Sequence, residues 1–155
     1  MDLLQTQVLA ETLMKKHGIW EQGWRFQFDR GLRRFGVCKY RNKIISLSRY
    51  LVELNNREDV QDVILHEIAH AIAGFKEGHG YKWKMVCVQI GAKPERCYDS
   101  DKVETPELKY YAKCGGCGKE FQKARMKKRE VKMSCMCQSG KSWDNRILLE
   151  FRERY

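Results

Sequence analysis

Two histidines four residues apart are the strongest chemical signal in this sequence. His66 and His70 enclose Glu67 in the segment His-Glu-Ile-Ala-His. Side chains at positions i and i+4 of a helix lie one above the other, so two imidazole nitrogens can bind one metal ion. Glu67 would lie beside these ligands, where its carboxylate can take a proton from a metal-activated water. The pattern predicts a hydrolytic metal site with Glu67 as the general base.

A catalytic zinc site usually takes three ligands from the protein and leaves the fourth position to water. His79 is the preferred third ligand, because it follows His70 by nine residues and the glycines on both sides of it let the chain turn back. Glu95 ranks lower as a third ligand, because a glycine and a proline shortly before it disfavour the helix that would have to carry it. The metzincin pattern is excluded, because Ala73 and Lys76 stand where it requires a glycine and a histidine.

Four cysteines predict a second metal site in the last third of the chain. Cys114 and Cys117 are separated by two glycines, and Cys135 and Cys137 follow seventeen residues later. Thiolates at such spacings are typical of a zinc ribbon, a module too small to fold without its metal. The single residue between Cys135 and Cys137 departs from the usual two, which leaves the geometry of the fourth ligand open. Reduced cysteines in an ordinary hairpin are the alternative to this structural zinc.

Positive charge is concentrated in the cysteine-bearing region. The net charge is +10, and residues 106–155 carry 13 basic and 6 acidic side chains against 17 and 14 in residues 1–105. Basic side chains next to aromatic ones suit the phosphates and bases of single-stranded nucleic acid, although a basic surface can also serve solubility alone. The predicted nucleic-acid contacts are Phe121, Lys123, Arg125, Lys127, Lys128, Arg129, Lys132 and Trp143.

Cysteine usage and hydropathy indicate a reducing compartment. The number of cysteines is seven, which is odd, and the first residues show no export signal. No run of eighteen apolar residues is present, which predicts no membrane segment. We therefore expect a cytoplasmic protein in a bacterial or phage-infected cell, or a nuclear protein in a eukaryote.

Apolar periodicity predicts three long helices. The first spans Leu3–Lys16, where apolar residues follow a helical stripe. The metal helix would begin at a cap formed by Asn55 or Asn56 and end at Gly74. A third helix is expected over residues 80–90, before a proline-containing linker.

Alternation of apolar and polar residues predicts strands between the first two helices. Trp24, Phe26 and Phe28 alternate with polar residues, which is typical of a strand with one buried face. Two further strands are expected around residues 35–40 and 43–47, separated by a turn. Together these segments predict a small antiparallel sheet.

Several motifs in order resemble the SprT-like family, which includes the Spartan proteases. The resemblance covers roughly residues 20–100. It implies a zincin-like domain in which His79 is the third zinc ligand, and proteolysis coupled to DNA, as in the clearance of proteins crosslinked to DNA. The motifs are Asn42-Lys43-Ile44-Ile45-Ser46-Leu47-Ser48, His66-Glu67-Ile68-Ala69-His70, His79-Gly80 followed by Trp83, Ile90-Gly91-Ala92-Lys93-Pro94, and Arg96-Cys97.

The sequence therefore predicts an α+β protein of two parts. Residues 1–105 would form a zincin-like zinc metalloendopeptidase domain, and residues 106–155 a basic zinc ribbon that holds single-stranded DNA near a protein substrate. One catalytic and one structural zinc are expected. The main alternative is a non-enzymatic nucleic-acid-binding or regulatory protein, whose histidine-bound zinc is closed by a fourth ligand such as Cys97 or Glu95. A peptidase without a nucleic-acid role is a third possibility.

Overall fold

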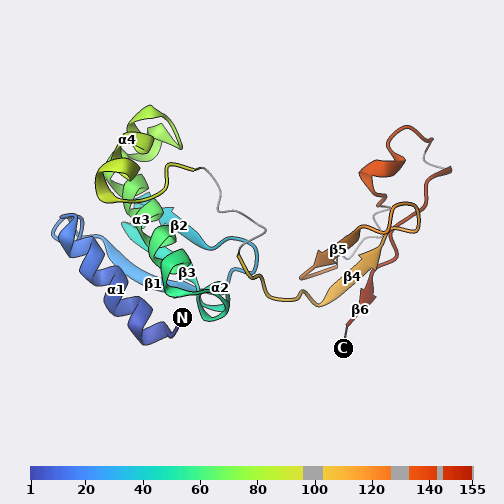
Figure 1. Cartoon of the computed structure of the whole chain (residues 1–155), viewed down its shortest axis with the longest axis horizontal. Helices are drawn as coiled ribbons and strands as arrows, with labels where there is room; N and C mark the ends of the chain where they lie inside the picture. Colours follow the sequence, from blue (N-terminus) through green and yellow to red (C-terminus); the bar gives the residue numbers. More distant parts are fainter. Residues whose placement is uncertain (96–102, 127–132, 143–144, 155) are drawn as a thin grey trace. The chain divides into compact units, whose positions relative to one another are not determined.

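The computed structural model describes residues 1–95, 103–126, 133–142 and 145–154. The chain divides into two compact units, Met1–Pro106 and Glu107–Tyr155, each of which is described by itself (Figure 1). No helix in these described ranges is long and apolar enough to cross a membrane.

The sheet of the first unit is mixed, so the prediction of an antiparallel sheet is wrong. It contains β1 (Arg25–Asp29), β2 (Gly36–Lys39) and β3 (Ile44–Ser48) in the order β1-β3-β2. β2 and β3 form an antiparallel hairpin around η1 (Tyr40–Asn42), whereas β1 pairs with the far edge of β3 in parallel. The physical reason is that period-2 patterning determines which face of a strand is buried but not which neighbour it pairs with.

The three predicted helices are confirmed, and their ends are where the capping residues place them. α1 (Leu3–Lys16) begins at Asp2, whose side chain accepts a hydrogen bond from the Gln5 backbone. α3 (Arg57–Ala73) begins at Asn56, which caps the Asp59 amide, and ends at Gly74 with φ 97°. α4 (Tyr81–Ile90) ends at Gly91 in the left-handed region. Such caps satisfy backbone groups that have no partner inside the helix.

A short helix between the sheet and the metal helix was not predicted. α2 (Arg49–Leu54) follows β3 directly, and the Ser48 side chain accepts a hydrogen bond from the Leu51 amide at its first turn. Six residues make fewer than two turns, so little periodicity is available to reveal such a helix.

The core of the first unit lies between the sheet and the helices. α1 and α3 contact each other, and both contact the sheet (Figure 1). Four of the five residues of β3, from Ile45 to Ser48, are buried because β3 is the central strand. The fully buried large side chains include Met14, Ile19, Phe35, Ile45, Leu47, Leu51, Val60, Ile64, Ile68 and Trp83.

The second unit is a small antiparallel sheet with a minimal core. It contains β4 (Tyr110–Lys113), β5 (Glu120–Lys123) and β6 (Arg152–Glu153) in the order β5-β4-β6, together with η3 (Met136–Gln138). Its core consists of a few apolar side chains and two of the cysteines, Cys114 and Cys135. A core of this size cannot stabilise the unit alone, which is consistent with a metal staple.

Candidate metal centres

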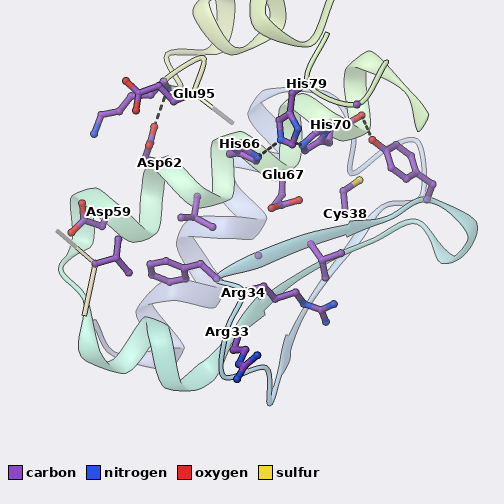
Figure 2. A pocket seen from close by; sticks show the side chains of 18 of the residues that line it. Arg33, Arg34, Cys38, Asp59, Asp62, His66, Glu67, His70, His79 and Glu95 are labelled. Carbon is purple, nitrogen blue, oxygen red and sulfur yellow. Dashed lines mark hydrogen bonds between the residues drawn. The ribbon is translucent and has the colours of Figure 1, made fainter. Parts of the chain in front are cut away.

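Three imidazoles from α3 and the following loop converge on one point. His66 and His70 lie one turn apart on α3, and His79 turns back toward them (Figure 2). The Nε2 atom of His79 lies 3.1 Å from Nε2 of His70 and 3.3 Å from Nε2 of His66. Two ligands of a tetrahedral zinc, each about 2.1 Å from the metal, lie about 3.4 Å apart. The three histidines therefore fit a single zinc ion.

Glycines around the loop make this convergence possible. Gly74 ends α3 with φ 97°, the short helix η2 (Phe75–Glu77) follows, and Gly78 has φ 52° and ψ −121°. A Cβ atom at Gly80 would lie 2.9 Å from the Glu77 carbonyl oxygen. Other residues would be strained at the two positive-φ positions, so the glycines allow the chain to return His79 to α3.

The indole of Trp83 lies against all three histidine rings. Trp83 is fully buried on α4, and its ring centroid lies 4.8 Å from that of His66, 5.2 Å from His70 and 4.6 Å from His79. The His70 ring is stacked on it at 27°. Contact with a rigid indole restricts rotation of the imidazoles and keeps bulk water away from one side of the site. The sequence analysis identified Trp83 only as part of a family motif and predicted no role for it.

Burial keeps two of the three histidines neutral. Loss of solvation and, to a smaller extent, the charge of the neighbouring histidines together lower the pKa of His66 and of His70 to about 4. Neutral imidazole is the form that binds a metal ion. Tyr40 helps to position α3 at this point, because its hydroxyl donates a hydrogen bond to the His70 carbonyl oxygen at 3.1 Å.

Glu67 lies beside the histidines but outside the group of converging ligand atoms. Its side chain is only 6% exposed and points toward β2 rather than at the imidazole nitrogens (Figure 2). Burial raises its pKa to about 8, opposed by a hydrogen bond from the Cys38 backbone and by the charge of Arg34. A cation at the histidines would lower this pKa by attraction. A carboxyl group with a pKa near neutrality is suited to accept and donate a proton.

Gly36 makes room for Glu67, a role that the sequence did not reveal. A Cβ atom at Gly36 would lie 2.8 Å from both Cγ and Oε1 of Glu67 and 3.0 Å from a methyl group of Val63. Only glycine therefore lets β2 approach α3 so closely at this point. The available signal was a glycine at the start of an expected strand, which often marks a close approach of the backbone.

The histidines and Glu67 open into a cleft of about 920 Å³ along β2. Among the described residues, β2 pairs only with β3, so its other edge has no strand partner. Away from the histidines the cleft is charged, with carboxylates on one wall and two arginines on the other (Figure 2). These charged residues are Asp59, Asp62, Glu95, Lys93, Arg33 and Arg34.

Neither alternative ligand completes the histidine group within the described part of the chain. Glu95 lines the cleft, but its carboxylate is not among the atoms that converge with the imidazoles. Cys97 lies outside the described residues. In the described ranges, three histidines make up this group, which is the usual number of protein ligands in a catalytic zinc site.

The four cysteines of the second unit form a separate group. Sγ of Cys114 lies 3.6 Å from Sγ of Cys137, and Sγ of Cys117 lies 3.6 Å from Sγ of Cys135. Thiolates around a tetrahedral zinc are about 3.8 Å apart, so the group fits a zinc ion. Hydrogen bonds from backbone amides, first that of Cys117, lower the pKa of the Cys114 thiol to about 7. The tight turn of η3 brings Cys137 into the group despite the short spacing.

Only some of the predicted nucleic-acid contacts lie in described segments. Phe121 is half-buried and packs against the small core, and the Lys123 ammonium lies 3.9 Å from the centroid of the Phe151 ring. Arg125 is exposed. The remaining predicted contacts, namely Lys127, Lys128, Arg129, Lys132 and Trp143, lie outside the described residues.

The solvent-facing side of the ribbon sheet presents residues that the sequence did not single out. Tyr111 is 38% exposed and is paired across the sheet with Arg152. The guanidinium of Arg154 lies 5.2 Å from the centroid of the Tyr111 ring. Apart from Trp143, the contacts predicted from the sequence lie between the two cysteine pairs, and Tyr111 lies before the first pair.

A histidine pair on a helix, a histidine on the next loop and a buried glutamate in an open cleft are consistent with a metallopeptidase-type protein. Residues 6–104 match the model of the SprT-like family, and the chain belongs to that family. It is also similar to the Protein SprT of Glaesserella parasuis serovar 5 (strain SH0165), with 29% identity over 89 residues. The matched region is 53% of this chain and 57% of that protein, so the chain spans little more than half of its relative's length.

Proposed function

We propose that this chain is a zinc-dependent endopeptidase with a zincin-like domain, and that it acts on proteins associated with DNA. The observation that carries the proposal is the convergence of His66, His70 and His79 next to Glu67 in an open cleft. A purely structural zinc would not need an open position or a neighbouring carboxyl group with a raised pKa.

Each residue of the site has a distinct task in this proposal. Zinc bound by the three imidazoles would supply a Lewis acid for the scissile carbonyl and lower the pKa of a coordinated water to about 7. Glu67 accepts the proton of the attacking water and passes it to the leaving amine. The backbone of β2, whose outer edge faces the cleft, can hydrogen-bond an extended polypeptide as an added strand.

Nucleic acid is the second proposed partner, through the ribbon. Residues 106–155 have an excess of seven basic side chains, and Tyr111 with Arg152 offers an aromatic and cationic surface. Bases can stack on such an aromatic ring while cations bind the phosphates. Proteins bound or crosslinked to DNA would then be held near the peptidase. The support for this part is the charge and the exposed aromatic side chain.

Cleavage of a DNA-binding protein, with and without single-stranded DNA, tests the proposal. Glu67→Gln should keep its zinc and lose cleavage, because the amide cannot accept the proton of water. Glu95→Gln is the matched control, since Glu95 lines the same cleft away from the imidazoles, and it should retain cleavage. Equal inactivity of wild type and both variants, with zinc and DNA still bound, would favour the non-enzymatic alternative.

A further inference from the structure

Phe75 is an exposed aromatic residue that is nevertheless held in place. Its side chain is 76% exposed, yet its ring contacts the Tyr40 ring edge-on, with centroids 5.4 Å apart. Tyr40 in turn contacts the buried Trp24 at 6.0 Å and donates its hydroxyl to the His70 carbonyl. The three rings form a continuous series from the core to the surface, so Phe75 presents an apolar surface whose position is fixed before any ligand binds.

The position of Phe75 places this surface at the candidate active site. Phe75 lies on η2, between the second and third histidines of the group, and it lines the cleft together with Tyr40. The charged residues of the cleft lie away from the histidines (Figure 2). The rings of Tyr40 and Phe75 therefore lie at the histidine part of the cleft, and the charged side chains lie farther along it.

We propose that Phe75, supported by Tyr40, is a specificity-determining residue that binds an apolar side chain of the substrate next to the scissile bond. This inference rests on the proposed peptidase function and names the residue class that the site prefers, namely leucine, isoleucine, methionine or phenylalanine. Contact between such a side chain and the Phe75 ring removes apolar surface of both from water. Because Tyr40 already fixes the ring, little side-chain entropy is lost on binding.

A polypeptide suits this cleft better than a nucleobase stacked on Phe75. Glu67 lies beside the histidines, and Asp59, Asp62 and Glu95 line the same cleft. Arg33, Arg34 and Lys93 line the cleft as well, so the preference for a polypeptide rests on the backbone of β2 and not on charge. The unpaired edge of β2 offers backbone hydrogen bonds to an extended polypeptide, and a nucleic acid strand has no such complementary backbone.

Binding can be measured without turnover in zinc-loaded Glu67→Gln protein. The probes are two fluorescently labelled unstructured peptides that differ only in a central Leu-Leu or Gly-Gly. We expect Phe75→Ala to weaken binding of the Leu-Leu peptide about tenfold and to leave the Gly-Gly peptide unchanged. Tyr81→Ala is the matched control, because Tyr81 is 78% exposed on the adjoining helix but does not line the cleft. The zinc content of both variants should equal that of the parent.

Three results would overturn the inference. Equal loss for both peptides would assign Phe75 a general structural role, and no loss for either would mean that the ring does not contact substrate. The third result is a single-stranded oligonucleotide that binds more tightly than the Leu-Leu peptide. If Phe75→Ala abolished this binding and Tyr81→Ala did not, Phe75 would be shown to stack on bases.

A second measurement separates this inference from the peptidase proposal. Wild-type enzyme should cleave a denatured protein mixture with apolar residues enriched next to the cut bonds, and Phe75→Ala should lose that enrichment while still cutting. If wild type and Phe75→Ala cleaved with the same residue preference, the role of Phe75 would be rejected and the peptidase proposal would stand. Absence of cleavage by wild type would reject the peptidase, and the peptide affinities would still decide whether Phe75 binds apolar side chains.

Discussion

At the scale of single residues, the site combines groups that the sequence could reveal with groups that it could not. The histidine pair and Glu67 are local in the sequence, and helical spacing alone predicts that they lie together. Gly36 and Trp83 act through contacts with residues far along the chain, and no local pattern encodes such contacts. Their roles became visible only when the distances to Glu67 and to the imidazoles were known.

The raised pKa of Glu67 gives the metal-free protein a characteristic pH dependence. Folding holds a proton on Glu67 up to about pH 8, whereas an unfolded glutamate loses it near pH 4.5, so rising pH favours the unfolded chain within this window. His66 and His70 act in the opposite direction, but only below pH 6.5, where the unfolded imidazoles become protonated. Between pH 6.5 and pH 8 Glu67 is therefore the main titrating group of the first unit, whereas the Cys114 thiol of the second unit, with a pKa of about 7, acts in the opposite direction.

We expect the first unit of the chelator-treated wild type to lose about 2 kcal/mol of unfolding free energy from pH 6.5 to pH 8. In the Glu67→Gln variant this side chain cannot ionise, so the unfolding free energy should fall much less over the same pH range. Urea unfolding followed by circular dichroism measures both proteins at each pH. A wild type and a variant with parallel pH profiles would show that Glu67 is not protonated in the folded protein.

Trp83 should affect metal binding separately from stability. Trp83→Phe keeps an aromatic ring but removes part of the surface that contacts the imidazoles, so we expect the dissociation constant for zinc to rise about tenfold, as for other supporting groups around a metal. Competition with a chromophoric chelator measures this constant. If the Trp83→Phe protein were less stable but bound zinc with unchanged affinity, Trp83 would contribute to the core and not to metal binding.

At the scale of elements, the ends of the helices were predicted better than the pairing of the strands. The ends of α1 and α3 follow from side-chain caps and a terminal glycine, all of which are local signals. The parallel pairing of β1 with β3 depends on how the chain crosses from one edge of the sheet to the other, which alternation does not specify. α2 was missed because it is too short to show periodicity. Strand propensity therefore does not predict which elements contact each other, and the contact of β2 with α3 depends on individual residues such as Gly36.

Gly36→Ala tests the close approach of β2 to α3. The added methyl group would overlap Glu67 and Val63, so we expect a loss of about 1–3 kcal/mol of unfolding free energy and displacement of the Glu67 carboxylate. Gly140→Ala is the control, because a Cβ atom there meets nothing within 4 Å and the change should be nearly neutral. Thermal unfolding of both variants provides the comparison, and equal effects would argue against the contact.

At the scale of the whole molecule, the chain consists of two units, each with its own group of potential metal ligands. The histidine group belongs to Met1–Pro106 and the cysteine group to Glu107–Tyr155. The first unit has a large core, whereas the second has only a few buried apolar side chains. The two units should therefore differ in how strongly they depend on metal.

Loss of the cysteine site should unfold the second unit and leave the first intact. In Cys114→Ser, we expect fast hydrogen exchange throughout residues 107–155 and unchanged protection in α3 and β3, because a metal-stapled module loses its fold with its ligand. Hydrogen exchange with mass spectrometry measures both regions in one experiment. Global loss of protection would instead show that the two units fold together.

The zinc content of the purified chain tests the central claim most directly. Native mass spectrometry of wild type, His79→Ala, Cys114→Ser and Glu67→Gln counts the ions bound to each protein. We expect two zinc ions in wild type and in Glu67→Gln, and one in each of the other two variants. Two ions in His79→Ala, or one in Glu67→Gln, would contradict a site in which three histidines hold the metal and Glu67 stands beside it as the base.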